Sequence, residues 1–206
     1  IKDTERYPLS CNAAVAGVVT TDNELGEMGI EITGAYLTKK VTWQNLNVPY
    51  NMGGQWKLDI NEGGSLTIMP GVTVLMTEDF LLRVGLYTEG KLVAVGTEEE
   101  PITFTSAMND KYPGDWQGIE FEEYVGAGSI LDHCKVLYGG RGDGANVDFY
   151  YTKGKVSLTN SEIAYSANWG IRVRDDDGIM PTLSNNNYHD NGSNYIHGVE
   201  HPDADM

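Results

Sequence analysis

A repeat of about 26 residues runs through much of this chain and limits the folds that it can adopt. Short apolar stretches recur at this period, and one column of them reads Phe104, Leu131, Leu158 and Leu183. The column two residues further on reads Ser106, His133, Asn160 and Asn185. Because two independent columns share one period, we interpret the chain as a stack of similar units.

A series of glycines supports the same period. It consists of Gly64, Gly90, Gly118, Gly144 and Gly170, which follow one another at nearly equal intervals. Most of these glycines open a short apolar piece such as "GSLTI" or "GIRV". Glycine adopts turn conformations that are closed to other residues, so the series predicts turns at regular intervals.

The apolar pieces have the length of strands and lack the pattern of a helix. No window sustains apolar residues at i, i+3 and i+4 over ten or more positions, as an amphipathic helix requires. Candidate two-residue hairpin turns are few, which disfavours a sandwich of hairpins. We therefore predict an all-β solenoid in which each coil of about 26 residues pairs in parallel with the next, about 4.8 Å away.

Stacking of coils predicts which side chains meet. Identical positions of successive coils touch, so Leu131, Leu158 and Leu183 should meet inside the tube. At a tight turn, Asn160 should hydrogen-bond Asn185 and so satisfy a buried amide. His133 stands in the same column, which favours a position in this ladder over a catalytic role.

The repeat divides the chain into three parts. Residues 1–40 show no clear period and are predicted to form an N-terminal cap or leading segment, because an open end of a solenoid exposes strand edges. Residues 41–195 are predicted to form the parallel β-helix, with about five or six coils. Residues 196–206 are polar and are predicted to be a tail, either a frayed end or a cut through a longer array.

Charge and hydropathy restrict the class of partner. The formal charge is −16, from 30 acidic and 14 basic residues. Such a surface repels phosphate backbones and anionic lipids, which argues against nucleic acid and bare membranes as partners. No stretch has the length of a membrane span. The first residues, "IKDTERYPLSC", are charged where a signal peptide would be apolar, so any leader is expected to have been removed already.

The two cysteines carry no recognisable motif. Cys11 and Cys134 lie far apart and show no CxxC spacing, which argues against a zinc or redox site. A single disulfide between them stays open at this point.

Three segments resemble one known group of proteins. They are "GSLTIMPGVTVLM" (64–76), "GKLVAVGTEEEPITFTS" (90–106) and "GDWQGIEF" (114–121). They are similar to right-handed parallel β-helix proteins of the pectate-lyase-like superfamily, especially bacterial secreted or cell-surface proteins. The resemblance covers residues 41–195. It implies a three-faced right-handed β-helix, an extracellular or cell-surface location and a carbohydrate-related or adhesive role, and it does not specify an activity.

Arginines and aspartates near residue 172 are candidates for catalysis. A polysaccharide lyase needs a base, usually Arg or Lys, and a cation that neutralises the substrate carboxylate. Arg172 and Arg174 project to one face if they lie in a strand, and with Asp175 they form the candidate catalytic set. The run Asp175, Asp176 and Asp177 is a candidate site for Ca²⁺.

Further acidic residues are expected to lie one or two coils from these arginines. They are Asp148 and the group Glu120, Glu122 and Glu123. Together with Arg172 and Arg174 they could form a cation site or a groove for acidic sugars. The alternative is a solvated outer face that ends in a turn at residues 176–178.

Two other groups of residues could bind ligands. Trp116, Trp169, Tyr150 and Tyr151 could stack against sugar rings, or could instead fill gaps in the packing. The C-terminal His189, His197 and His201, with Asp190, Asp203 and Asp205, could form a surface metal site, or could belong to a disordered polar end.

These observations favour a secreted or surface-exposed β-helix module that is not catalytic. It is predicted to bind a glycan or a surface protein, or to act as a scaffold. The alternative is a polysaccharide-active enzyme, a lyase or an epimerase of an acidic polysaccharide. The sequence contains no GxSxG elbow, no HExxH motif and no P-loop.

Overall fold

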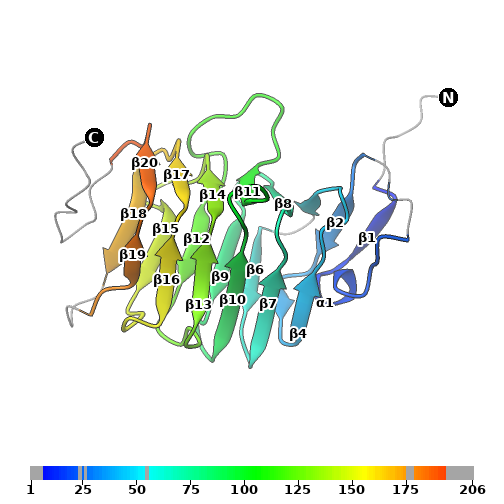
Figure 1. Cartoon of the computed structure of the whole chain (residues 1–206), viewed down its shortest axis with the longest axis horizontal. Helices are drawn as coiled ribbons and strands as arrows, with labels where there is room; N and C mark the ends of the chain where they lie inside the picture. The colour runs from blue at the N-terminus through cyan, green and yellow to red at the C-terminus, as the bar shows by residue number, and fades with distance from the viewer. Residues whose placement is uncertain (1–6, 23–24, 26, 54–55, 175–178, 194–206) are drawn as a thin grey trace.

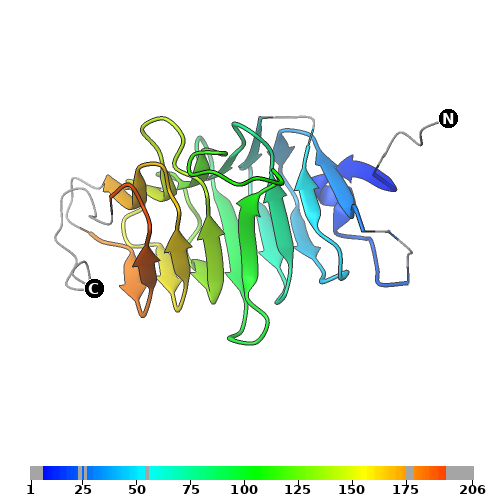
Figure 2. The ribbon, with the colours of Figure 1, turned by 90° about the horizontal axis from the view of Figure 1, so that it is seen from above.

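The computed structural model describes residues 7–22, 25, 27–53, 56–174 and 179–193. In these parts the chain forms a β-solenoid of about 7 turns with about 25 residues per turn, built from three parallel sheets (Figure 1). Figure 2 shows the turns stacked in chain order along the long axis. The predicted all-β parallel solenoid is therefore confirmed. The predicted five or six coils were too few, because strands before residue 40 also join the sheets.

Each turn contributes one strand to each sheet, so neighbouring strands in a sheet are three apart in chain order for most of the solenoid. The first sheet consists of β1 (Leu9–Asn12), β2 (Ile30–Thr33), β5 (Tyr50–Met52), β8 (Thr73–Met76), β11 (Ile102–Ser106), β14 (Cys134–Leu137), β17 (Glu162–Ala164) and β20 (Asn187–His189). The second sheet consists of β4 (Lys40–Trp43), β7 (Gly64–Ile68), β10 (Gly90–Val95), β13 (Ser129–Asp132), β16 (Val156–Thr159) and β19 (Thr182–Ser184). The third sheet consists of β3 (Tyr36–Leu37), β6 (Lys57–Ile60), β9 (Leu81–Val84), β12 (Gly118–Phe121), β15 (Ala145–Tyr150) and β18 (Trp169–Arg174).

The predicted leucine column is present in the second sheet. Leu158 of β16 lies opposite Leu131 on one side and Leu183 on the other. Leu131 and Leu158 are fully buried, and Leu183 packs against the core at its C-terminal end. The turns therefore pack like with like, as the repeat predicted.

Phe104 and Ser106 were assigned to the wrong columns. Both lie in β11 of the first sheet, where Phe104 faces Val136. In the preceding turn, the residue opposite Leu131 is Ala94 and not Phe104. The reason is the long loop 107–117 between β11 and β12, which lengthens this turn, so that counting one period back from Leu131 ends in the next strand.

The asparagine ladder is present at the corner between the second and first sheets. Asn185 Nδ2 donates to Asn160 Oδ1 at 3.2 Å, and Asn160 Nδ2 donates to Asp132 Oδ1 at 2.8 Å. His133, Asn160 and Asn185 share a left-handed backbone, with φ of 48°, 49° and 55°. The amides are exposed, so their role is to hold the corner and not to satisfy buried groups.

The glycine series is not one column. Gly64 and Gly90 face each other in the second sheet, whereas Gly118 and Gly170 lie in the third. Gly144 precedes β15 and belongs to no strand. The regular spacing of all five glycines was therefore a partly misleading signal, although Gly118 does adopt a positive φ of 132°.

A short helix lies at the N-terminal end of the solenoid. Helix α1 (Ala13–Ala16) packs against β1 to β4 and buries Ala13 and Ala16. Asn12 Oδ1 accepts hydrogen bonds from the first backbone N–H groups of α1, and Trp43 Nε1 donates to the Ala13 carbonyl at 3.1 Å. The segment predicted as a cap, 1–40, thus holds this helix together with the first strands of the sheets. The predicted tail, 196–206, lies outside the described residues.

The interior contains stacked aromatic side chains, one pair within a turn and one pair between turns. Trp43 lies parallel to Tyr50, with ring centroids 4.7 Å apart, and Phe121 lies over Phe149 at 5.6 Å. Such offset pairs add to the apolar burial of each ring. Phe121 and Phe149 are in register, so this pair extends the core from one turn to the next.

The question of a disulfide is answered by topology. Cys11 lies in β1 and Cys134 in β14, five strands apart in the first sheet, and both are free thiols. At about 4.8 Å per strand the two residues are about 24 Å apart, beyond the span of a disulfide.

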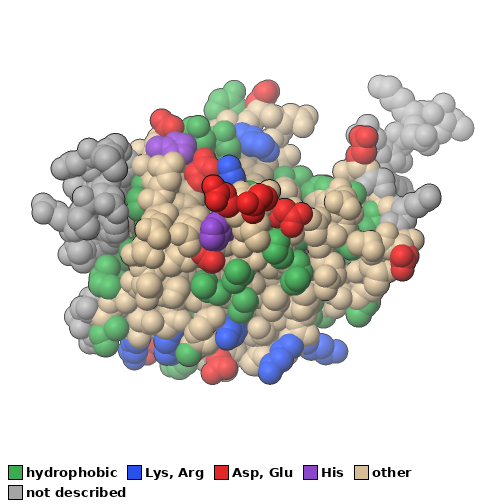
Figure 3. Space-filling model, viewed as in Figure 1, with side chains coloured by type: hydrophobic (Ala, Val, Ile, Leu, Met, Phe, Trp, Pro, Cys, Tyr) green, Lys and Arg blue, Asp and Glu red, His purple; other side chains and the backbone are tan. Residues whose placement is uncertain are grey.

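The charged side chains are unevenly distributed over the surface. On the face shown in Figure 3, acidic side chains form a row across the upper middle, and lysines and arginines lie mostly along the lower edge. Among the described residues there is no helix of the length and hydropathy needed to cross a membrane.

We expect the leucine column to carry much of the stability. The change Leu158→Ala removes a fully buried side chain between two turns and should lower the free energy of unfolding by about 2–5 kcal/mol. Ser157→Ala, on the outward side of the same strand, is the matched control and should change it by less than about 0.5 kcal/mol. Urea denaturation followed by circular dichroism measures both, and equal effects would contradict the packing described here.

Candidate functional site

The outer face of the third sheet carries a column of charged residues. Successive strands β6, β9, β12, β15 and β18 place in register Asp59, Arg83, Glu120, Asp148 and Arg172. Neighbouring positions in this register are about 4.8 Å apart, close enough for ion pairs between adjacent strands. The column therefore forms a connected charged surface across the sheet.

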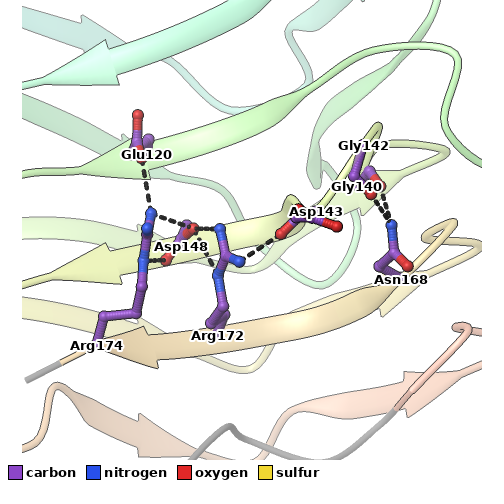
Figure 4. Close-up of polar contacts among 8 residues, drawn as sticks. All are labelled: Glu120, Gly140, Gly142, Asp143, Asp148, Asn168, Arg172 and Arg174. Atoms are coloured by element: carbon purple, nitrogen blue, oxygen red, sulfur yellow. Dashed lines mark hydrogen bonds and ion pairs between the residues drawn. The ribbon is translucent and has the colours of Figure 1, made fainter.

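Asp148 is the centre of this surface (Figure 4). Its carboxylate accepts a hydrogen bond from Arg172 Nε at 2.9 Å and another from Arg174 Nη2 at 2.8 Å. Arg174 Nη2 also donates to Glu120 Oε1 at 2.9 Å, so this arginine joins two carboxylates. The Asp148 side chain is only 6% exposed. A carboxylate this buried needs its paired cations, which makes the geometry rigid.

A groove of about 710 Å³ runs over this part of the sheet. Its lining is mostly polar and charged and comprises Asp79, Leu81, Gln117, Gly118, Ile119, Glu120, Arg141, Gly142, Asp143, Gly144, Ala145, Asp148, Arg172 and Arg174. Charged side chains thus meet the solvent along a concave surface. This differs from the apolar lining that is typical of drug-sized ligand pockets.

One wall of the groove is the loop 139–144, which precedes β15. Arg141 forms ion pairs with Glu78 and Asp79 of the turn before β9. Asn168 Nδ2 donates to the carbonyls of Gly140 and Gly142 (Figure 4), and both glycines have positive φ. Gly142 has open space around it, but its φ of 65° is a backbone conformation that residues with a side chain rarely adopt. The loop is therefore fixed to the adjacent turn.

Glu120, which lines the groove, and the nearby Glu122 have raised pKa values. Burial, and then the charge of Asp148, raises the pKa of Glu120 above its ordinary value. Burial, and then the charge of Glu120, raises the pKa of Glu122 to about 7. Glu122 is 8% exposed. Near neutral pH this carboxyl therefore changes its protonation state in response to its surroundings.

The structure brings together the arginines that the sequence selected. Arg172 and Arg174 do project to one face of β18, as predicted, and Asp148 and Glu120 lie beside them. Both arginines are bound by carboxylates, so neither is an unpaired base. The third candidate, Asp175, lies outside the described residues, as do Asp176 and Asp177.

The described residues contain no cluster of acidic or histidine side chains that is typical of a metal site. Over the part of the chain that the structure describes, no group of three His, Cys, Asp or Glu is arranged to hold a metal ion. The carboxylates of the charged column are engaged by guanidinium or ammonium groups instead.

The C-terminal histidine cluster is only partly described. His189 contacts Asp190 and Glu162 at 2.8 Å and 3.2 Å. The bond to Asp190, followed by that to Glu162, raises the pKa of His189. The other predicted members, His197, His201, Asp203 and Asp205, lie outside the described residues.

Trp116 was the wrong choice as a sugar-stacking residue. It is fully buried, and its indole Nε1 donates to the Leu137 carbonyl at 2.9 Å, so it belongs to the core. Trp169 is partly buried at the start of β18, opposite Ala145. Its role in binding stays a prediction.

The two predicted tyrosines lie next to the charged column. Tyr150 and Tyr151 meet edge to face with centroids 4.5 Å apart, and the guanidinium of Arg174 lies 4.6 Å from the Tyr150 ring centroid. The Tyr150 ring therefore positions Arg174 through a cation–π contact. A role of these tyrosines in sugar binding stays a prediction.

Sequence analysis missed several residues of this surface. Asp59 and Arg83 could have been found, because they stand about one period apart and alternate with buried apolar neighbours. Asp79, Arg141 and Asp143 gave no such signal, because they lie in loops whose positions do not follow the period.

Comparison with known proteins identifies one family. A family model described as a pectate-lyase-like β-helix domain matches residues 34–146, which is more than half of the chain. The match includes β9, β12 and the loop 139–144 and ends before Asp148. No curated protein and no solved structure matches the chain.

Asp148 should be essential for the integrity of this surface. The change Asp148→Asn leaves Arg172 and Arg174 without their shared buried anion and should lower the free energy of unfolding by about 3 kcal/mol. The control Asp143→Asn removes an exposed carboxylate and should change it by less than about 0.5 kcal/mol. Both are measured by urea denaturation at pH 7, and an unaffected Asp148 variant would contradict the central role of this carboxylate.

The folded protein should become less stable as pH rises, because the buried Glu122 carboxyl then loses its proton. Its pKa is about 7 in the folded chain and about 4.3 in the unfolded chain, so folding favours the protonated form. The stability that this group contributes is complete below about pH 4.3 and is lost as pH rises through about 7. Glu122→Gln should therefore gain up to about 3 kcal/mol relative to the wild type between pH 5 and pH 8.

The matched control is Glu123→Gln, which changes an exposed neighbour. Its pH dependence of stability should follow that of the wild type. Thermal or urea unfolding across this pH range measures all three proteins. Parallel curves for wild type and Glu122→Gln would show that the Glu122 carboxyl titrates normally.

Proposed function

The chain belongs to the pectate-lyase-like β-helix domain family, and from that premise we propose that it is a non-catalytic module that binds a glycan outside the cell or at the cell surface. The observation that carries this proposal is the groove of about 710 Å³ on the third sheet. Its polar groups are held in place before any ligand arrives. A polysaccharide presents many hydroxyl groups to such a surface.

The rigidity of the groove supports binding of a hydroxylated ligand. Arg172, Arg174 and Asp148 hold one another, and the loop with Arg141 is tied to Asn168 and Asp79. Donors and acceptors that are already ordered lose little conformational entropy when they bind. Guanidinium and carboxylate groups also form the stronger, charge-assisted hydrogen bonds.

The charge of the groove bears on the class of glycan. The charged lining consists of three arginines and four acidic residues: Arg141, Arg172, Arg174, Asp79, Glu120, Asp143 and Asp148. The two signs nearly balance, although the whole chain has a charge of −16. The groove therefore accepts neutral or weakly acidic sugars more readily than the rest of the surface would.

A polysaccharide-active enzyme is the second candidate, and Glu122 is the observation that favours it. A general acid or base works best with a pKa near the operating pH, and the pKa of Glu122 is about 7. Against this role, Glu122 does not line the groove, and the arginines that a lyase would use as bases are paired. Binding without catalysis therefore explains more of the site.

Affinity electrophoresis tests the proposed function. Wild-type protein should be retarded in gels that contain at least one of polygalacturonate, alginate, xylan or soluble β-glucan. Arg141→Ala and Arg172→Ala each remove a donor from the groove and should weaken this binding about tenfold. The charge-matched control Lys39→Ala, at an exposed position away from the groove lining, should bind like the wild type.

The same four polymers test the enzymatic alternative. Incubation with and without Ca²⁺ should produce no unsaturated product, as followed by ultraviolet absorbance. Product formation that disappears in Glu122→Gln would establish the enzyme and reject the non-catalytic module. Retardation by none of the polymers would reject glycan binding for this set.

A further inference from the structure

Two exposed aromatic side chains lie on the same sheet as the groove, at its N-terminal side. Tyr36 in β3 is 64% exposed and Trp56, just before β6, is 58% exposed. The Lys57 ammonium lies 5.1 Å from the Tyr36 ring centroid and 4.8 Å from that of Trp56. We call Tyr36, Trp56 and Lys57 the aromatic platform. The two exposed rings share one ammonium and so form a small apolar patch, and exposed patches of this kind often mark sites of interaction.

The aromatic platform is held in place by the charged column. Lys57 Nζ donates to Asp59 Oδ2 at 2.7 Å, and Asp59 Oδ1 accepts from Arg83 Nε at 2.9 Å. Asp59 is almost completely buried, so this acceptor is fixed. The anchored ammonium in turn attracts both rings through cation–π contacts. Both aromatic rings are thus ordered while much of their surface stays in contact with water.

The aromatic platform continues directly into the groove. Lys57 lies opposite Leu81 in the parallel ladder, and Leu81 lies opposite Gly118. Leu81 and Gly118 both line the groove. The Leu81 N–H donates to the Trp56 carbonyl at 2.9 Å. One strand spacing, about 4.8 Å, therefore separates Lys57 from the nearest groove residue.

We infer that the aromatic platform is a stacking subsite for a pyranose ring of the glycan that occupies the groove. This inference rests on the proposed function. The C–H face of a pyranose is apolar and flat and packs on the faces of Trp56 and Tyr36. The Lys57 ammonium lies over one face of each ring, so the sugar would pack on the opposite, exposed faces, and Lys57 supplies a donor for a sugar hydroxyl or carboxylate nearby.

A glycan explains this surface better than a protein partner. Two aromatic side chains bordered by Lys57, Asp59 and Arg83 form a small apolar area surrounded by charge. Stable protein interfaces bury about 800 Å² per partner around an apolar centre. A chain of sugars needs only one ring on the aromatic platform and continues across the strands toward β18.

Titration calorimetry with defined oligosaccharides tests the inference. The probes are galacturonate, alginate, xylose and cellobiose-type oligomers, against wild type, Trp56→Ala, Tyr36→Ala, Arg172→Ala and Tyr87→Ala. Tyr87 is 76% exposed, follows β9 and does not line the groove, so its variant is the matched control. The aromatic platform variants should each bind about tenfold more weakly, and Tyr87→Ala should bind like the wild type.

Tryptophan fluorescence provides a second readout. Trp43 and Trp116 are fully buried and Trp169 is partly buried, so a sugar stacked on the exposed Trp56 should shift the wild-type emission to shorter wavelength, and Trp56→Ala separates this signal from that of Trp169. The shift should persist in Tyr87→Ala and be lost in Trp56→Ala. Because Trp56 and Tyr36 are exposed, circular dichroism should show both variants folded, which separates lost binding from lost structure.

Each result decides the question. Weaker binding in both aromatic platform variants, with the emission shift, supports the inference. Normal binding by Trp56→Ala and Tyr36→Ala, together with weak binding by Arg172→Ala, overturns the inference and leaves the proposed function intact. No binding of any oligosaccharide by the wild type overturns both. Concentration-dependent dimers that Trp56→Ala abolishes would show that the aromatic platform binds a second copy of the chain instead.

Discussion

The parallel backbone pairing between successive turns is the constraint on which this structure depends. Strands of the three sheets bond to the equivalent strand of the next turn, about 25 residues further along, and the repeat distance across strands is about 4.8 Å. A side chain must therefore be compatible with its equivalents directly above and below. Inside the tube this requirement is met by leucines and by stacked rings such as Phe121 and Phe149. A side chain that does not fit its equivalents therefore disturbs the packing of both neighbouring turns.

The same constraint shapes the charged face. Pairing places Glu120 and Asp148 on adjacent strands, which would put two carboxylates side by side. Arg174 reaches both of them from β18, and Arg172 completes the neutralisation of Asp148. Ion pairs as buried as these add little net stability compared with apolar packing, because desolvation offsets their attraction. What they provide is a fixed arrangement of donors and acceptors on a rigid sheet.

The site arises where the regular solenoid is interrupted. The groove is lined by residues of the loop 139–144, by Asp79 in the turn before β9, and by residues of the strands. On the N-terminal side of the groove, the exposed Trp56 and Tyr36 lie around Lys57. Rigid scaffolds often carry their function on such loops, and members of one fold differ mainly in them. This is why membership of the family does not by itself specify a ligand.

The architecture could be predicted from the amino-acid order alone: the period, the parallel stacking, the meeting of Leu131, Leu158 and Leu183, and the common face of Arg172 and Arg174. These features are local or periodic, and alternation along a strand suffices to place them. The column of Phe104 became clear only from the three-dimensional fold, because the loop 107–117 changes the number of residues in one turn.

Tertiary structure also decided which tryptophan is exposed. Trp116 and Trp56 both stand just before a strand, and their residue type predicts nothing about which ring faces solvent. The orientation depends on how each corner folds over the core, and that is set by contacts with other turns, such as the bond from Trp116 to Leu137. For the same reason the groove could not be predicted, since its walls come from loops that the period does not place. A repeat encodes what every turn shares, and the groove depends on what single turns do differently.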